Sequence, residues 1–235
     1  MIRWLARSAA VLLAAAAPAA IYDQTFTSGF ANNGMIPDHD PAGWQNSQTV
    51  DVGGGWTVTD VGVRLNISGG WNGDLYGYLR YEAPGGGQER LFILLDRVGY
   101  SGTGNGYNDP GLAISLSDVG GFGLENYQAH DPVYNSSGQL TGTWRPDNGA
   151  TRFGGPGGVF TGVDPNGTWT LFFADLAPGD QSQLMSWGLE ISAVPEPTVW
   201  ALAIFGIGAG GVVGVRTWRR RRRGISGTHR TVTPS

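Results

Sequence analysis

The sequence predicts an all-β protein, either a sandwich or a barrel, and three observations support that prediction. Forty of the 235 residues are glycine, and an interior glycine costs a helix about 1 kcal/mol relative to alanine. Several short stretches alternate between apolar and polar residues, which is the period of a half-buried strand. Turns rich in Gly, Pro and Ser separate these stretches, as in proteins built from many short strands.

The expected strands occupy most of the central body. Val61, Val63, Leu65 and Ile67 share one face of an early strand, and small or polar residues fill its other face. The run at residues 91–95 is apolar throughout, which predicts a strand buried on both faces. Other alternating strands are expected around residues 75–81, 112–116, 169–173 and 187–191.

The composition excludes several classes of site and partner. Cysteine is absent, which removes disulfides, thiolate nucleophiles and Cys-based metal centres. All fifteen basic residues are arginine, so lysine-based chemistry is excluded as well. Residues 8–215 contain six arginines and all nineteen acidic residues, and the other arginines lie near the two ends of the chain. An acidic body repels nucleic acid, so no nucleic-acid partner is expected.

Residues 1–20 are typical of a secretory signal peptide. Arg3 and Arg7 precede a short apolar run, and Ala17 and Ala19 supply small residues at the −3 and −1 positions of a cleavage site near Ala20. The apolar run is too short to span a bilayer, which disfavours the alternative of an N-terminal membrane anchor. We therefore expect signal peptidase to remove this segment during export.

The C-terminal region has three consecutive features. Val194 leads into the motif Pro195-Glu196-Pro197, and the uncharged residues 198–215 follow. A helix of that length measures roughly 27 Å at about 1.5 Å per residue, enough to cross the hydrocarbon core of a membrane. A cluster of arginines follows this helix. Under the positive-inside rule, that cluster stays in the cytoplasm and the body of the protein lies on the other side of the membrane. This cluster consists of Arg219, Arg220, Arg221, Arg222 and Arg223.

This order of motif, spanning helix and arginine cluster resembles the PEP-CTERM sorting signal of Gram-negative bacteria. The resemblance implies recognition of residues 194–223 by an exosortase, a membrane-embedded transpeptidase-like enzyme, and cleavage near Pro195, Glu196 and Pro197. The precursor is then expected in the inner membrane, and the processed protein at the cell surface or outside the cell. An ordinary tail anchor is the alternative. The polar tail, residues 224–235, departs from the family pattern, which stops soon after the arginines.

The body carries a second resemblance, to the P domain (P/Homo B domain) of kexin- and furin-like proprotein convertases. That domain is also appended to many bacterial secreted proteases. The resemblance covers roughly residues 36–193, is weak between residues 97 and 160, and implies a jelly-roll-like β-sandwich spanning residues 21–193. The matching segments are Met35-Ile36-Pro37-Asp38, Asp60-Val61-Gly62-Val63-Arg64-Leu65-Asn66-Ile67, Gly73-Asp74-Leu75, Leu79, Asn166-Gly167-Thr168-Trp169-Thr170-Leu171, Asp175, Gly179-Asp180 and Leu184-Met185-Ser186-Trp187-Gly188-Leu189.

Three carboxylates in turn-like positions are the candidate metal ligands. Asp74, Asp175 and Asp180 either bond the backbone of their own turns or, with turn carbonyls, hold Ca²⁺, whose ligands are all oxygen. The sequence contains no defined calcium loop such as an EF-hand. No other cofactor is predicted.

No catalytic group is expected. His39, His130 and His229 are the only histidines, and no serine or zinc-binding motif accompanies them. The P domain is the non-catalytic partner in its proteases, so a serine-type endopeptidase label would come from family association alone. The sequence therefore predicts a secreted, exosortase-sorted, non-catalytic protein of the cell envelope or of a biofilm and exopolysaccharide matrix.

Two alternative functions remain. One is an accessory domain of a separate subtilisin- or kexin-like protease, and the other is a carbohydrate-binding module. The second depends on exposed aromatic rings near Gly/Asn-rich loops, whereas Trp169 and Trp187 are expected in the core. The rings are those of Trp71, Tyr76, Tyr78, Tyr81, Tyr100, Tyr107, Tyr127, Tyr134 and Trp144.

Overall fold

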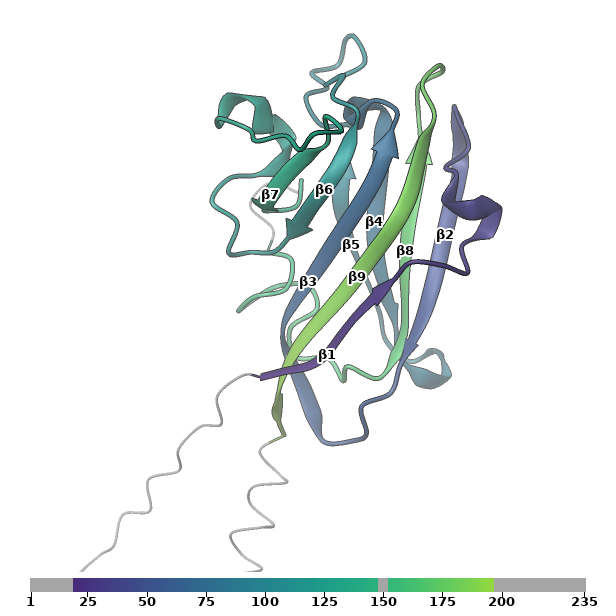
Figure 1. Ribbon diagram of the computed structural model, residues 1–235. Coiled ribbons are helices and arrows are strands. Elements are labelled where there is room, and N and C mark those ends of the chain that lie inside the picture. Colours follow the sequence, from purple (N-terminus) through teal and green to yellow (C-terminus); the bar gives the residue numbers. More distant parts are fainter. Residues whose placement is uncertain (1–18, 148–151, 197–235) are drawn as a thin grey trace, which may run out of the picture. The chain divides into compact units, whose positions relative to one another are not determined.

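The computed structural model describes residues 19–147 and 152–196, and these residues form two packed β-sheets (Figure 1). The five-stranded sheet has the order β1-β9-β3-β6-β7 and the four-stranded sheet the order β2-β8-β4-β5. The predicted all-β sandwich is thereby confirmed. No helix within the described ranges is long and apolar enough to cross a membrane. Most of the expected signal peptide and the whole expected spanning helix lie outside those ranges.

In the five-stranded sheet, the pairs β1–β9 and β3–β6 are antiparallel, and the pair β6–β7 is parallel. The parallel pair requires a long crossover, which carries the 3-10 helix η4 (Leu124–Ala129). The strands are β1 (Ala19–Phe26), β9 (Ser182–Pro195), β3 (Trp56–Gly69), β6 (Gly111–Leu116) and β7 (Leu140–Trp144).

In the four-stranded sheet, all three pairs are antiparallel. Short 3-10 helices η1 (Ala31–Gly34), η2 (Asn72–Asp74) and η3 (Pro84–Gly86) stand in the connections. The strands are β2 (Asp40–Val50), β8 (Gly167–Asp175), β4 (Leu75–Glu82) and β5 (Glu89–Asp96).

The core lies between the sheets and is formed by the inward residues of the alternating strands. Trp169 and Trp187 are fully buried, as the sequence predicts. The Trp169 ring packs against Tyr81 with ring centroids 4.8 Å apart. Each indole nitrogen also donates a hydrogen bond, to the Pro165 carbonyl at 3.0 Å and to Asn46 Oδ1 at 2.9 Å. The two large side chains are thus buried without leaving a polar atom unpaired.

The strand predicted at residues 91–95 is confirmed as part of β5, but the prediction that it is buried on both faces is wrong. Strand β5 pairs only with β4 and forms the edge of the four-stranded sheet. Phe92, Leu94 and Leu95 are buried, but Leu91 is 46% exposed. A continuous apolar run therefore does not require burial on both faces, because an edge strand can carry apolar side chains on its solvent face.

Candidate functional site

Two buried aspartates, Asp74 and Asp175, lie at one end of the four-stranded sheet, and the charges of Asp38 and Asp180 reach them. We call these four residues the acidic cluster. Asp74 immediately precedes β4, whose first residue pairs with Asp175, the last residue of β8. The Leu176 amide donates to the Asp74 carbonyl at 2.9 Å. The Gly179 amide donates to both carboxylate oxygens of Asp38, at 3.1 and 3.3 Å. The register between β4 and β8 therefore places Asp74 near Asp175. The bonds from Gly179 hold Asp38 beside the segment that follows β8.

The two central members of the acidic cluster are buried. Asp175 is 0% exposed and Asp74 is 3% exposed. The Ala177 amide donates to Asp175 Oδ1 at 3.3 Å, but Asp175 Oδ2 and Asp74 Oδ1 have no hydrogen-bond partner. A buried carboxylate oxygen without a partner is costly, because it has lost its hydration without replacement.

Burial also changes the protonation of this pair. Desolvation, together with the charges of Asp74 and Asp38, raises the pKa of Asp175 to about 6, although the Ala177 hydrogen bond acts to lower it. Desolvation likewise raises the pKa of Asp74, while Arg97 lowers it and Asp180 raises it. Without a neutralising partner, the two carboxylates resist being charged together.

Close backbone packing positions Asp74. A Cβ on Gly73 would lie 2.3 Å from the Asn105 carbonyl oxygen and 2.4 Å from the Tyr107 nitrogen, so no larger residue fits there. The Gly73 amide donates to the Tyr107 carbonyl at 2.8 Å. Arg97 Nε donates to the Gly73 carbonyl at 3.3 Å, and its guanidinium carbon lies 4.0 Å from the Tyr100 ring centroid.

The structure therefore brings together two of the three candidate metal ligands, Asp74 and Asp175. Asp180 is exposed at the rim of the acidic cluster. Asp38 also belongs to the acidic cluster, and the one local indication of it in the sequence is its place after Ile36 and Pro37 in the first matching segment. Among the described residues, no three acidic or histidine side chains stand close enough to hold one metal ion between them.

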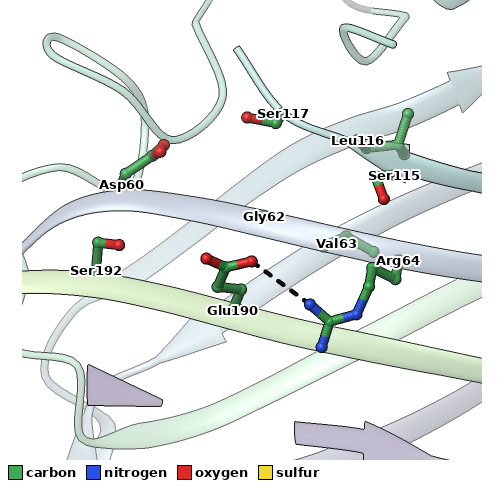
Figure 2. Close-up of a pocket in the computed structure, with 9 residues that line it drawn as sticks. All are labelled: Asp60, Gly62, Val63, Arg64, Ser115, Leu116, Ser117, Glu190 and Ser192. Atoms are coloured by element: carbon green, nitrogen blue, oxygen red, sulfur yellow. Dashed lines mark hydrogen bonds and ion pairs between the residues drawn. The ribbon is translucent and has the colours of Figure 1, made fainter. Parts of the chain in front are cut away.

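A second polar site lies on the outer face of the five-stranded sheet (Figure 2). Asp60 and Arg64 from β3 and Glu190 from β9 surround a cavity of about 100 Å³. Arg64 Nη1 lies 3.4 Å from Glu190 Oε2, and Arg64 also pairs with Asp23. Burial raises the pKa of Asp60, and the charges of Asp118 and Glu190 add to the effect. Serine hydroxyls complete the lining: Ser115, Ser117 and Ser192.

A larger hollow of about 460 Å³ adjoins this cavity and shares Arg64 and Ser115 with it. Together we call them the outer-face groove. No local sequence pattern predicts the groove, because it is formed by strands that are distant along the chain. Small and polar residues line the larger hollow, among them Thr25, Asn66, Ala113, Gly142, Thr143, Ser186 and Gly188.

The two chain ends of the described body meet. Ala19 begins β1 and pairs with Ala193, and Ala20 pairs with Ser192. Strand β9 runs on to Pro195, so it ends inside the predicted sorting motif (Figure 1). Ala17, Pro197, residues 198–215 and the arginine cluster lie outside the described residues. The predicted cleavage positions remain predictions.

The histidines do not form a catalytic arrangement within the described part of the chain. His39 is exposed beside the acidic cluster, and the His130 ring stacks on Phe122 with centroids 3.8 Å apart. No hydrogen bond joins either imidazole to a serine hydroxyl there. His229 lies outside the described residues. The absence of catalytic activity stays a prediction.

The expected exposed aromatics fall into two groups. The prediction is wrong for Tyr81, Tyr127 and Trp144, which are 0%, 0% and 7% exposed, because inward alternation or the crossover buries them. Tyr100 and Tyr134 are exposed at 40% and 38%. Half-buried rings make up the rest: Trp71, Tyr76, Tyr78 and Tyr107.

Comparisons with known proteins give little further information. No family model matches the chain, and no curated protein matches it. A chain in the crystal structure of the Aeromonas sobria serine protease (ASP) and chaperone (ORF2) complex is similar at 16% identity and a TM-score of 0.43. The alignment covers 77% of this chain and 28% of that one, so this chain spans less than a third of the other. A likeness of this level assigns neither family nor activity.

Proposed function

We propose that the protein is an exported, non-catalytic β-sandwich of the jelly-roll-like P-domain type, sorted to the cell surface or its polysaccharide matrix by processing at both ends. The observation that supports the proposal most directly is the pairing of β1 with β9. Ala19, at the predicted signal-peptide cut, lies opposite Ala193, two residues before the predicted sorting motif. Both expected cuts therefore fall at the margin of the paired region.

Cutting at these positions leaves the fold intact. A cut after Ala19 removes only the first residue of β1, and the register from Ala20 to Phe26 is kept. A cut near Pro195 leaves the residues of β9 that pair with β1 in place. A sandwich that tolerates both cuts suits a protein trimmed at both ends after export.

The sorting step is tested by replacing Pro195, Glu196 and Pro197 with alanine in the full chain. We expect the uncut precursor to accumulate in the inner membrane, measured by cell fractionation and immunoblotting of an epitope near Asp51. The matched control replaces Thr231, Val232 and Thr233 in the polar tail and should leave processing unchanged. Normal processing of the first variant would contradict recognition by an exosortase.

A second candidate function is glycan binding in the outer-face groove. The observation that favours it is Gly62, a mid-strand glycine whose backbone lies outside the left-handed region that favours glycine. A Cβ there would make only ordinary contacts, 3.7 Å to Glu190 Cβ and 3.8 Å to the Leu116 carbonyl oxygen. Glycine weakens a strand interior, and the surrounding packing leaves room for a larger residue at position 62. A glycine there instead keeps the floor of the groove open. The groove hydroxyls can exchange hydrogen bonds with sugar hydroxyls.

Filling the groove tests this function. We expect Gly62→Val to abolish retention of the purified protein on the native exopolysaccharide in a co-sedimentation assay. The matched control is Gly54→Val, because Gly54 has no atom within 4 Å of its Cβ position. Equal retention of both variants and the wild type would exclude the groove as the glycan site.

The protease-accessory alternative rests on the sequence resemblance alone. It predicts that the processed protein has no peptidase activity of its own but alters the stability or yield of a co-secreted protease. Peptide hydrolysis by the purified protein, abolished by serine-directed inhibitors, would contradict both this alternative and the main proposal.

A further inference from the structure

We propose that the acidic cluster is a binding site for a divalent cation of the Ca²⁺ type, held chiefly by Asp74 and Asp175. This inference is independent of sorting and of glycan binding. It starts from the two buried carboxylates, whose free oxygens Asp74 Oδ1 and Asp175 Oδ2 lack any hydrogen-bond donor. Strand pairing places Asp74 next to the residue that pairs with Asp175, and the charge of Asp74 disfavours the charged form of Asp175.

No salt bridge among the described residues neutralises this pair, and only the exposed His39 adds a positive influence on Asp175. Arg97 is the cation whose field reaches Asp74, but its Nε donates to the Gly73 carbonyl and its guanidinium covers the Tyr100 ring. Among the described residues, no salt bridge joins Arg97 to an aspartate of the cluster. Asp38 and Asp180 add two further negative charges close by. An external cation would remove this repulsion and coordinate both free oxygens.

The donor set selects the kind of ion. The cluster offers carboxylate oxygens, with no thiolate and only the exposed His39 nearby. Hard oxygen ligands favour Ca²⁺ or Mg²⁺ over zinc or copper. Because no three acidic side chains within the described ranges surround one point, peptide oxygens and water must complete the coordination shell. Ca²⁺ tolerates such an irregular shell, whereas Mg²⁺ demands a near-ideal octahedron.

The position of the site predicts its effect. Asp175 ends β8, Asp74 precedes β4, and Asp38 precedes β2, so the ion would tie together the ends of three adjacent strands. Few charged ligands and an exposed rim predict weak binding, with a Kd of about 10⁻⁴–10⁻³ M, as in extracellular modules. Such an affinity would be saturated only outside the cytoplasm.

The test uses the purified, processed protein, stripped with a chelator and dialysed at pH 7.5. We expect Ca²⁺ at about ten times its Kd to raise Tm by about 3–6 °C, and isothermal titration calorimetry to give one ion per chain. Asp74→Asn and Asp175→Asn keep the side-chain shape and should lose both effects while remaining folded without the ion. Asp131→Asn, which removes an exposed charge outside the acidic cluster, should keep both.

Three outcomes would overturn the proposal. An equal rise of Tm with Mg²⁺ or with NaCl of matched ionic strength would show general charge screening. A Ca²⁺ response retained by both Asn variants would place the ion elsewhere. No response to Ca²⁺, together with a Tm that rises as the pH falls from 7 to 5, would show that a shared proton neutralises the pair. Should an Asn variant fail to fold, calorimetry is done on Asp180→Asn, whose side chain is exposed. A weaker Ca²⁺ affinity than that of the wild type would support the site, and an unchanged affinity would contradict it.

Discussion

Asp175 combines complete burial with a negative charge, and its titration should dominate the pH response of the acidic cluster. Burial raises its pKa to about 6, above the value of about 3.9 of an unfolded chain. The folded state then binds the proton more tightly than the unfolded state. In calcium-free buffer, the free energy of unfolding should therefore fall as the pH rises from about 4 to about 6, and stay lower above that range.

Asp175→Asn isolates this contribution. We expect the variant to show a shallower fall of the unfolding free energy between pH 4 and 7, measured by urea denaturation in the presence of a chelator. Part of the fall should remain, because burial also raises the pKa of Asp147 to about 6. A pH profile parallel to that of the wild type would contradict the assignment.

Tyr127 is the centre of a buried network that fixes the crossover between β6 and β7. Its hydroxyl donates to Asp109 Oδ2 at 2.7 Å and accepts from Asn72 Nδ2 at 3.1 Å. Tyr127→Phe should lower the free energy of unfolding by about 1–3 kcal/mol, because Asp109 loses a donor. Urea unfolding measures the loss. The control Tyr100→Phe, on an exposed ring, should change it by less than about 0.5 kcal/mol.

At the scale of elements, strand β4 depends on a glycine that alternation does not reveal. A Cβ on Gly77 would lie 2.4 Å from Cε1 of the buried Phe173 ring on the neighbouring β8. Gly77→Ala should therefore destabilise the fold by about 1–3 kcal/mol through overpacking. Gly87→Ala, with nothing within 4 Å of the new Cβ, should be close to neutral. Thermal unfolding of the two variants checks the difference.

The strands that the sequence predicts are those with an alternating apolar face. Strands β3, β4, β6, β8 and β9 have this pattern and are confirmed. Strand β2 was not predicted, because its eleven residues bury only Trp44 and Val50. Strands β1 and β7 are edge strands, and their pairing depends on distant partners. Local alternation reports burial, and it cannot report sheet order.

The same distinction explains how much of the candidate sites could be predicted. Asp74 and Asp175 were found because turn residues beside strands carry their own local signal. Their burial follows from the register between β4 and β8, which no local pattern encodes. The same holds for the carboxylate oxygen that each of them leaves without a hydrogen-bond partner. The outer-face groove was missed entirely, because it joins residues of β3, β6 and β9 that are far apart in the sequence.

At the scale of the whole molecule, one hydrophobic cluster spans both sheets. Buried residues from both layers, including Ile67 of β3 and Trp169 of β8, belong to the same cluster. A chain without disulfides and with a shared core should unfold in one cooperative step. Tryptophan fluorescence and far-UV circular dichroism should give coincident urea transitions. Separate midpoints would show that the sheets unfold independently.

The interior place of β9 has a mechanical consequence for a protein tethered through its C-terminal end. Strand β9 lies between β1 and β3, so a pull on Pro195 along the strand loads two hydrogen-bonded ladders at once, in shear. Shearing breaks many backbone bonds together, whereas peeling an edge strand breaks them one by one. Such an attachment would hold against flowing liquid even though each bond is weak.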